Sequence, residues 1–66
     1  MKPEKGIVNN YNGFTGKILS NDNKEYLLTD NNTKEELKAN DQVTFIPENE
    51  KGINIARFVK KLGNNK

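Results

Sequence analysis

The chain contains no cysteine and no histidine. Without cysteine, no disulfide can stabilise a small core and no thiolate can hold zinc. Without histidine, the chain lacks the commonest general base and the commonest metal ligand. Hydrophobic residues are only 32% of the composition, no apolar run approaches the roughly 20 residues of a membrane span, and nothing resembles a secretory signal. These absences disfavour an enzyme and favour a small cytoplasmic binding module without a cofactor.

Length and charge set further bounds. At 66 residues, we expect one domain with its core at about 5–62 and frayed ends at 1–4 and 63–66. A chain this short buries only about 60% of its unfolded surface, so its stability is expected to be marginal. Residues 1–50 carry six lysines against nine acids, whereas residues 51–66 carry five basic residues and no acid. That basic end is interpreted either as a solvated tail or as a contact for phosphate.

Short β-like segments alternate with polar turns along the chain. They lie at about residues 5–12, 17–19, 25–29, 42–47 and 53–62. Twelve asparagines suit a fold with many short connections, and Asn12-Gly13 is the best hairpin signal. Val8 and Tyr11 differ in parity, so a bulge or strong bend is needed if both face the core. Val43 and Phe45 share one face of their strand and are predicted to be core residues.

Two segments are less regular. Residues 32–38 favour a single helical turn capped by Asn32 or Thr33. Residues 53–62 are ambiguous, because the spacing of their apolar residues fits both a helix and a strand. Pro47 either ends its strand or marks a sheet edge. Because closure removes exposed edges, five short strands predict an all-β protein, a five-stranded antiparallel barrel of the OB type.

Four stretches share their order and spacing with a known family. They are Gly6-Ile7-Val8 with Tyr11 and Asn12, then Gly16-Lys17-Ile18, then Leu37, Asn40, Asp41, Val43 and Phe45, and finally Lys51-Gly52 with Ala56, Val59 and Leu62. Together they resemble the bacterial cold-shock domain over about residues 5–62. The resemblance implies an OB barrel that binds single-stranded nucleic acid on one exposed face.

The departures from that family fall on its binding face. Lys17 stands where the family has a stacking ring, and Leu27 and Thr29 stand where it has an aromatic residue and a histidine. Asn10 stands in place of the family's tryptophan. Since base–aromatic stacking contributes about 1–3 kcal/mol per base, these changes predict weaker binding.

The remaining aromatic residues are divided between core and surface. Tyr26 is predicted to face the core with Phe45, whereas Tyr11 is compatible with either the core or the binding face. Phe14 and Phe58 are the best candidates for exposed rings, although local packing explains each equally well. Arg57 and Lys60 flank Phe58, a mixture of charge and rings that suits single-stranded nucleic acid.

The leading prediction is a non-enzymatic protein that binds single-stranded RNA or DNA weakly and with little sequence preference, as a monomer or weak dimer. Its predicted contact residues are Asn10, Tyr11, Phe14, Lys17, Leu27, Thr29, Arg57, Phe58 and Lys60. The alternative is a protein-interaction module on the same barrel, because Leu19 and Leu27 form a small apolar patch on the exposed face. No metal, cofactor or membrane is expected as a partner, since the acidic residues show no calcium-loop spacing.

Overall fold

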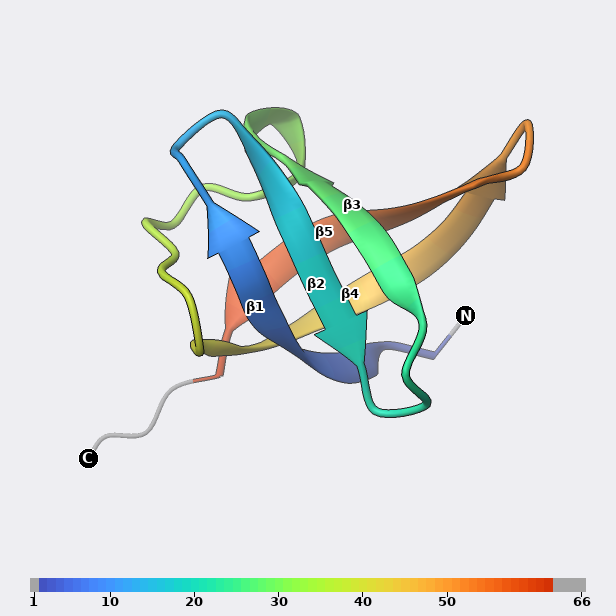
Figure 1. Ribbon diagram of the computed structural model, residues 1–66, viewed down its shortest axis with the longest axis horizontal. Coiled ribbons are helices and arrows are strands. Elements are labelled where there is room, and N and C mark those ends of the chain that lie inside the picture. The colour runs from blue at the N-terminus through green and yellow to red at the C-terminus, as the bar shows by residue number, and fades with distance from the viewer. Residues whose placement is uncertain (1, 63–66) are drawn as a thin grey trace.

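Five strands close into a barrel in the computed structural model, which describes residues 2–62 (Figure 1). They are β1 (Glu4–Tyr11), β2 (Thr15–Ser20), β3 (Glu25–Thr29), β4 (Gln42–Glu50) and β5 (Ile53–Lys61). A short 3₁₀ helix, η1 (Asp30–Asn32), follows β3. The strands are hydrogen-bonded in the order β1-β2-β3-β5-β4, and β4 returns to β1. Of the expected frayed ends, residues 1 and 63–66 lie outside the described residues, whereas β1 begins at Glu4.

The expectation of a wholly antiparallel barrel is wrong at one seam. β3 and β5 run parallel and are joined at Leu27 and Ile55, whereas the other neighbouring pairs are antiparallel. Strands can alternate in direction around a closed ring only if their number is even. A ring of five therefore needs a parallel pair, and β4 lies in the long crossover that a parallel connection requires.

The β1–β2 hairpin contains the bulge that the parity of Val8 and Tyr11 predicted. Val8 pairs with Ile18, but Asn10 pairs with Lys17, so β1 has one residue more than β2 between these pairs. The turn that follows is built on the side chain of Asn12, whose Oδ1 accepts the backbone N–H groups of residues 14 and 15, both at 2.9 Å. Gly13 adopts φ +96°, which explains the Asn-Gly pair.

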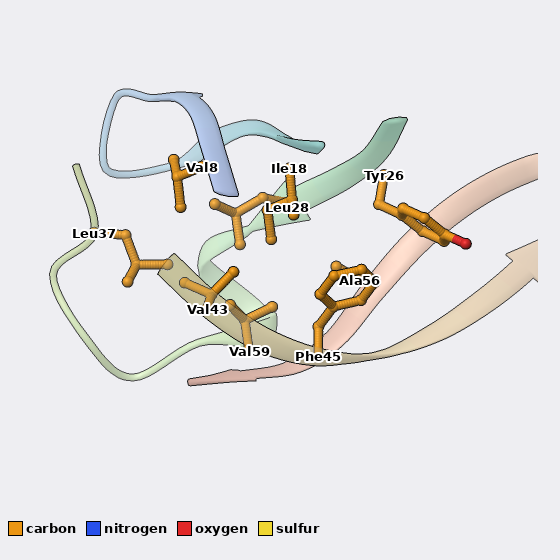
Figure 2. Close-up of a cluster of buried hydrophobic side chains, with 9 residues drawn as sticks. All are labelled: Val8, Ile18, Tyr26, Leu28, Leu37, Val43, Phe45, Ala56 and Val59. Atoms are coloured by element: carbon orange, nitrogen blue, oxygen red, sulfur yellow. The ribbon is translucent and has the colours of Figure 1, made fainter. Parts of the chain in front are cut away.

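The barrel interior is filled by side chains from all five strands (Figure 2). The buried hydrophobic residues are Val8, Ile18, Tyr26, Leu28, Leu37, Val43, Phe45, Ala56 and Val59. The core positions predicted for Val43, Phe45 and Tyr26 are thereby confirmed. The rings of Tyr26 and Phe45 lie side by side with their centroids 4.9 Å apart and their planes tilted by 54°, an arrangement that aromatic pairs favour.

The helical turn expected at residues 32–38 lies earlier in the chain. η1 spans Asp30–Asn32, and Thr33 is already extended, with φ −147°. The chain then runs without helix or strand to Leu37, whose side chain enters the core (Figure 2). Its end is fastened to the β1 bulge, because Val8 N–H donates to Asp41 O at 2.9 Å and Asn40 N–H donates to Val8 O at 2.7 Å. These two hydrogen bonds give partners to backbone groups in a segment that forms no helix or strand of its own.

Residues 53–62, which fit both a helix and a strand, form β5 up to Lys61. Thr44 pairs with Lys60 and Ile46 pairs with Arg57, so β5 carries one extra residue in this interval. Phe58 lies in this bulge with φ +51°, a backbone conformation that costs about 1–3 kcal/mol for a residue other than glycine. The bulge turns both Ala56 and Val59 inward. Their spacing of three residues explains why the sequence also matched a helix.

The β4–β5 hairpin extends beyond the other strands (Figure 1). β1 pairs with β4 only up to Phe45, opposite Glu4, whereas β4 continues to Glu50 in register with Ile53. Pro47 lies in this projecting half and therefore marks a sheet edge and does not end the strand. A proline on an edge hinders pairing with another chain, since it has no N–H to donate.

Candidate functional site

One row of side chains crosses the outer face of the first three strands. Asn10 on β1 pairs with Lys17 on β2, and Lys17 pairs with Leu27 on β3. Because the residues beside them in β2 and β3 are buried, strand alternation points Lys17 and Leu27 away from the core. A shallow groove of about 370 Å³ lies here, which we call the strand-face groove. It is lined by Asn10, Tyr11, Asn12, Thr15, Gly16, Lys17 and Leu27.

Tyr11, which the sequence placed either in the core or on the binding face, contacts both. Its half-buried ring packs against the core and also lines the strand-face groove. Its hydroxyl donates a hydrogen bond to the carbonyl of Gly13 at 3.2 Å. Desolvation and, to a smaller extent, the negative charge of Asp30 raise the pKa of the Tyr11 hydroxyl above 10.0. The raised pKa favours the protonated phenol, the form that donates to the Gly13 carbonyl.

The charge in the strand-face groove comes from Lys17. Its Nζ lies 3.8 Å from Oε1 of Glu25 on the neighbouring strand, and the two side chains are 54% and 56% exposed. An exposed ion pair of this length is weak and is screened by salt. An anion that approaches the groove therefore competes with a single, loosely held carboxylate for Lys17.

Two further predicted residues border the groove at one end of the barrel. Phe14, at the β1–β2 turn, is 71% exposed, so the structure places its ring at the surface. Its carbonyl accepts the N–H of Asp30 at 3.0 Å, which holds the turn beside η1 (Figure 1). Thr29 is half-buried opposite Thr15. Its hydroxyl accepts a hydrogen bond from Asn32 Nδ2 at 3.0 Å, so this oxygen already has a partner.

Phe58 and Lys60 line a different groove, next to η1. This η1 groove has a volume of about 470 Å³. It is lined by Asn31, Asn32, Thr33, Lys34, Glu35, Phe58, Val59 and Lys60. Phe58 is 72% exposed, as expected for one of the two surface rings. The predicted contact residues thus do not form one continuous cluster: four line the strand-face groove, two line the η1 groove, and the other three line neither, namely Phe14, Thr29 and Arg57.

Arg57 belongs to neither groove. Its Nε lies 2.7 Å from Oε1 of Glu48, and its Nη2 lies 3.7 Å from Oε2 of Glu50. Both acids are on β4, so the guanidinium is neutralised within the hairpin. Lys61 is also paired, with its Nζ 3.7 Å from Oδ2 of Asp41. The basic end of the chain is therefore partly neutralised by acids from earlier in the sequence.

Several groove residues are not among the contact residues predicted from the sequence. Asn12, Thr15 and Gly16 complete the strand-face groove, and residues 31–35 complete the η1 groove. The Asn12-Gly13 turn signal could have identified the first group, because a tight hairpin places the residues on both sides of its turn next to each other. The second group had no comparable signal, since it meets β5 only through the bridge between Thr33 and Val59.

Residues 2–62, the part of the chain that the structure describes, offer little other chemistry. Within that range, no cluster of three or more acidic side chains could hold a metal ion, and no helix is long and apolar enough to cross a membrane. Comparison with known proteins gave no match to any protein-family model and none to a curated protein. The case for a function therefore rests on the geometry and chemistry of the two grooves.

Proposed function

We propose that the protein is a small OB-type protein that binds single-stranded RNA or DNA in the strand-face groove. The observation that carries the proposal is the position of this groove. It lies across β1, β2 and β3 and reaches the β1–β2 turn. OB barrels bind oligonucleotides on the face of their second and third strands and with the loop that joins their first two strands.

The groove offers a suitable set of contacts. Lys17 can approach a phosphate, and the side-chain amide of Asn10 can hydrogen-bond to a base edge or a ribose hydroxyl. Phe14 offers an exposed ring on which a base can stack, a contact worth about 1–3 kcal/mol. With few rings on this face, phosphate contacts supply a large share of the affinity. Binding is therefore weak, salt-sensitive and tolerant of sequence.

The resemblance to the cold-shock domain supports the same proposal. In that family, bases stack on the exposed aromatic residues of this face, whereas here Lys17 and Leu27 occupy two of those positions. The protein would then be a divergent cold-shock-like member that keeps the barrel but relies more on charge. Its cellular role would be that of an RNA chaperone or a regulator of transcription or translation, without catalysis.

The test is a titration of fluorescein-labelled oligo-dT or oligo-U, followed by fluorescence anisotropy over a range of salt concentrations. Each phosphate contact contributes about −0.7 to the log–log slope for a single strand. Lys17→Ala should weaken binding and flatten the slope by about 0.7. Glu25→Gln should tighten binding, because it removes the carboxylate that lies 3.8 Å from Lys17.

The matched control is Lys51→Ala, which removes the same charge from the exposed tip of the β4–β5 hairpin. It should change the affinity and the slope much less than Lys17→Ala. Equal effects of the two substitutions would mean that binding is a response to net charge and does not involve the strand-face groove. No binding by the wild-type protein at low salt would refute the proposal.

A protein-interaction module remains the second candidate, because aliphatic side chains are exposed at the surface of the barrel. Ile7 is 44%, Leu19 39% and Ile53 54% exposed. Ile7 and Leu19 are cross-strand partners. Exposed apolar patches often mark protein contacts. Elution of the wild-type protein from a single-stranded DNA column at low salt would favour this second function.

A further inference from the structure

We infer that the η1 groove is a second contact site for the same nucleic-acid strand, with Phe58 as its stacking platform. This inference rests on the proposed function and assigns to the protein a longer binding path than the strand-face groove alone. The occupant is a segment of single-stranded RNA or DNA that continues past the β1–β2 turn.

Phe58 has an unusual backbone conformation for an exposed aromatic residue. The residue lies in the β5 bulge at φ +51°, a region that bulky side chains rarely adopt. Its ring is also 72% exposed. Both features disfavour phenylalanine if the position serves folding alone, since asparagine or glycine adopts this conformation with less strain. Strained residues of this kind cluster at binding sites.

The η1 groove beside the Phe58 ring has a basic and amide-rich lining. Lys34 and Lys60 line it from opposite sides, one after η1 and the other on β5. Glu35 is the acid in this lining, and its Oε1 accepts the backbone N–H of Lys61 at 2.6 Å. The lining therefore carries one net positive charge. Asn31 and Asn32 add side-chain amides. The lysines would then meet phosphate, the amides would meet base edges, and the Phe58 ring would meet the face of a base.

The two grooves are connected at the β1–β2 turn. Thr15 lines the strand-face groove, and Asn31 lines the η1 groove. Between them, the carbonyl of Phe14 accepts the N–H of Asp30 at 3.0 Å, so the turn and η1 lie side by side (Figure 1). A strand that leaves the first groove at this end passes the exposed Phe14 ring and reaches the second. The two exposed phenylalanines would then hold bases of one continuous strand.

The test compares a short oligo-dT of about four nucleotides with a long one of about twelve, both within the range of site sizes for one OB fold. The wild-type protein should bind the long probe more tightly. Phe58→Ala should weaken binding of the long probe by roughly 5- to 150-fold, the effect of losing one base stack. Binding of the short probe, which the strand-face groove accommodates, should not change.

Two further variants separate binding from folding. Phe58→Asn should melt at the same or a higher temperature than the wild type, since asparagine tolerates the left-handed region, and should lose the same affinity for the long probe. Ile53→Ala removes another exposed apolar side chain from the same strand and should change neither affinity. Long-probe binding that is unaffected in both Phe58 variants would overturn the inference, as would an equal loss for both probes. If the wild type bound neither probe, the proposed function itself would fail.

Discussion

Gly16→Ala tests the packing that forms the strand-face groove. Gly16 lies on β2 opposite Tyr11, just after the bulge in β1. A Cβ atom at this position would lie 2.0 Å from the carbonyl oxygen of Asn10 and 2.7 Å from the Cα of Tyr11. Both are backbone atoms, so no side-chain rotation can relieve the contact. β1 must move away from β2 by about 1 Å or more to restore the 3.0 Å below which Cβ contacts are essentially never found.

Such a shift disrupts the close packing between β1 and β2. Overpacking costs about 1–3 kcal/mol and occasionally more, and we expect about 3 kcal/mol here because only backbone can yield. Small proteins have about 0.05–0.15 kcal/mol of stability per residue, which for 66 residues is about 3–10 kcal/mol. Each kcal/mol corresponds to about 4–8 °C in a domain of this size. The melting temperature should therefore fall by at least about 12 °C.

The assay is thermal unfolding followed by circular dichroism, with Gly52→Ala as the matched control. A Cβ at Gly52 would meet nothing within 4 Å, but its φ is +84°. Alanine there suffers only backbone strain of about 1–2 kcal/mol. Gly16→Ala should therefore be the more destabilising of the two. A Gly16→Ala variant that melts within a few degrees of the wild type would refute the close approach of β1 and β2 at the bulge.

Three further predictions follow from the core and the surface. Phe45→Ala should lower the melting temperature by at least about 12 °C, because truncating a buried ring costs about 3–5 kcal/mol; a near-wild-type melt would contradict its core position. Replacing Lys17 and Lys60 together by alanine should flatten the salt dependence of oligonucleotide binding by about 1.4, one contact from each groove, and an unchanged slope would exclude both contacts. The hydrogen bond from Ser20 lowers the pKa of Asp22 below 3.8, so its stabilisation is complete above that pH and is lost as the pH falls through the lower, folded-state pKa. Asp22→Asn should therefore reduce the loss of stability on acidification, measured by urea unfolding at neutral pH and near pH 3, and an acid response like that of the wild type would contradict this role.

Much of the barrel could be predicted from local sequence. Because side chains alternate along a strand with a period of two, the sequence predicts that Val43 and Phe45 share the core face, and both are buried. The unequal parity of Val8 and Tyr11 requires a bulge or strong bend if both face the core, and the register shows the bulge. The prediction of a wholly antiparallel barrel did not include the parallel pairing of β3 and β5. An odd number of strands in a closed ring already requires one parallel pair.

Part of the candidate site could also be predicted, and part could not. The outward positions of Lys17 and Leu27 follow from alternation, and the exposed rings were correctly selected. The neutralisation of Arg57 by Glu48 and Glu50 could not be foreseen, because it depends on the length of the β4–β5 hairpin and on which residues face each other across it. Phe58 and Lys17 line different grooves. Their separation depends on how the barrel closes, which also could not be foreseen from the sequence.

The sequence by itself determined the first strands, the position of the first hairpin turn and the core positions of Val43, Phe45 and Tyr26. These properties depend on neighbours a few residues apart, and backbone sterics and hydrophobic patterning act at that range. Only the tertiary structure decided that Leu37 enters the core from an extended segment and that Phe58 takes a left-handed conformation in a bulge. Both follow from closing five strands into a ring, since the last strand and the connection before it must fit a space that the other strands have already defined.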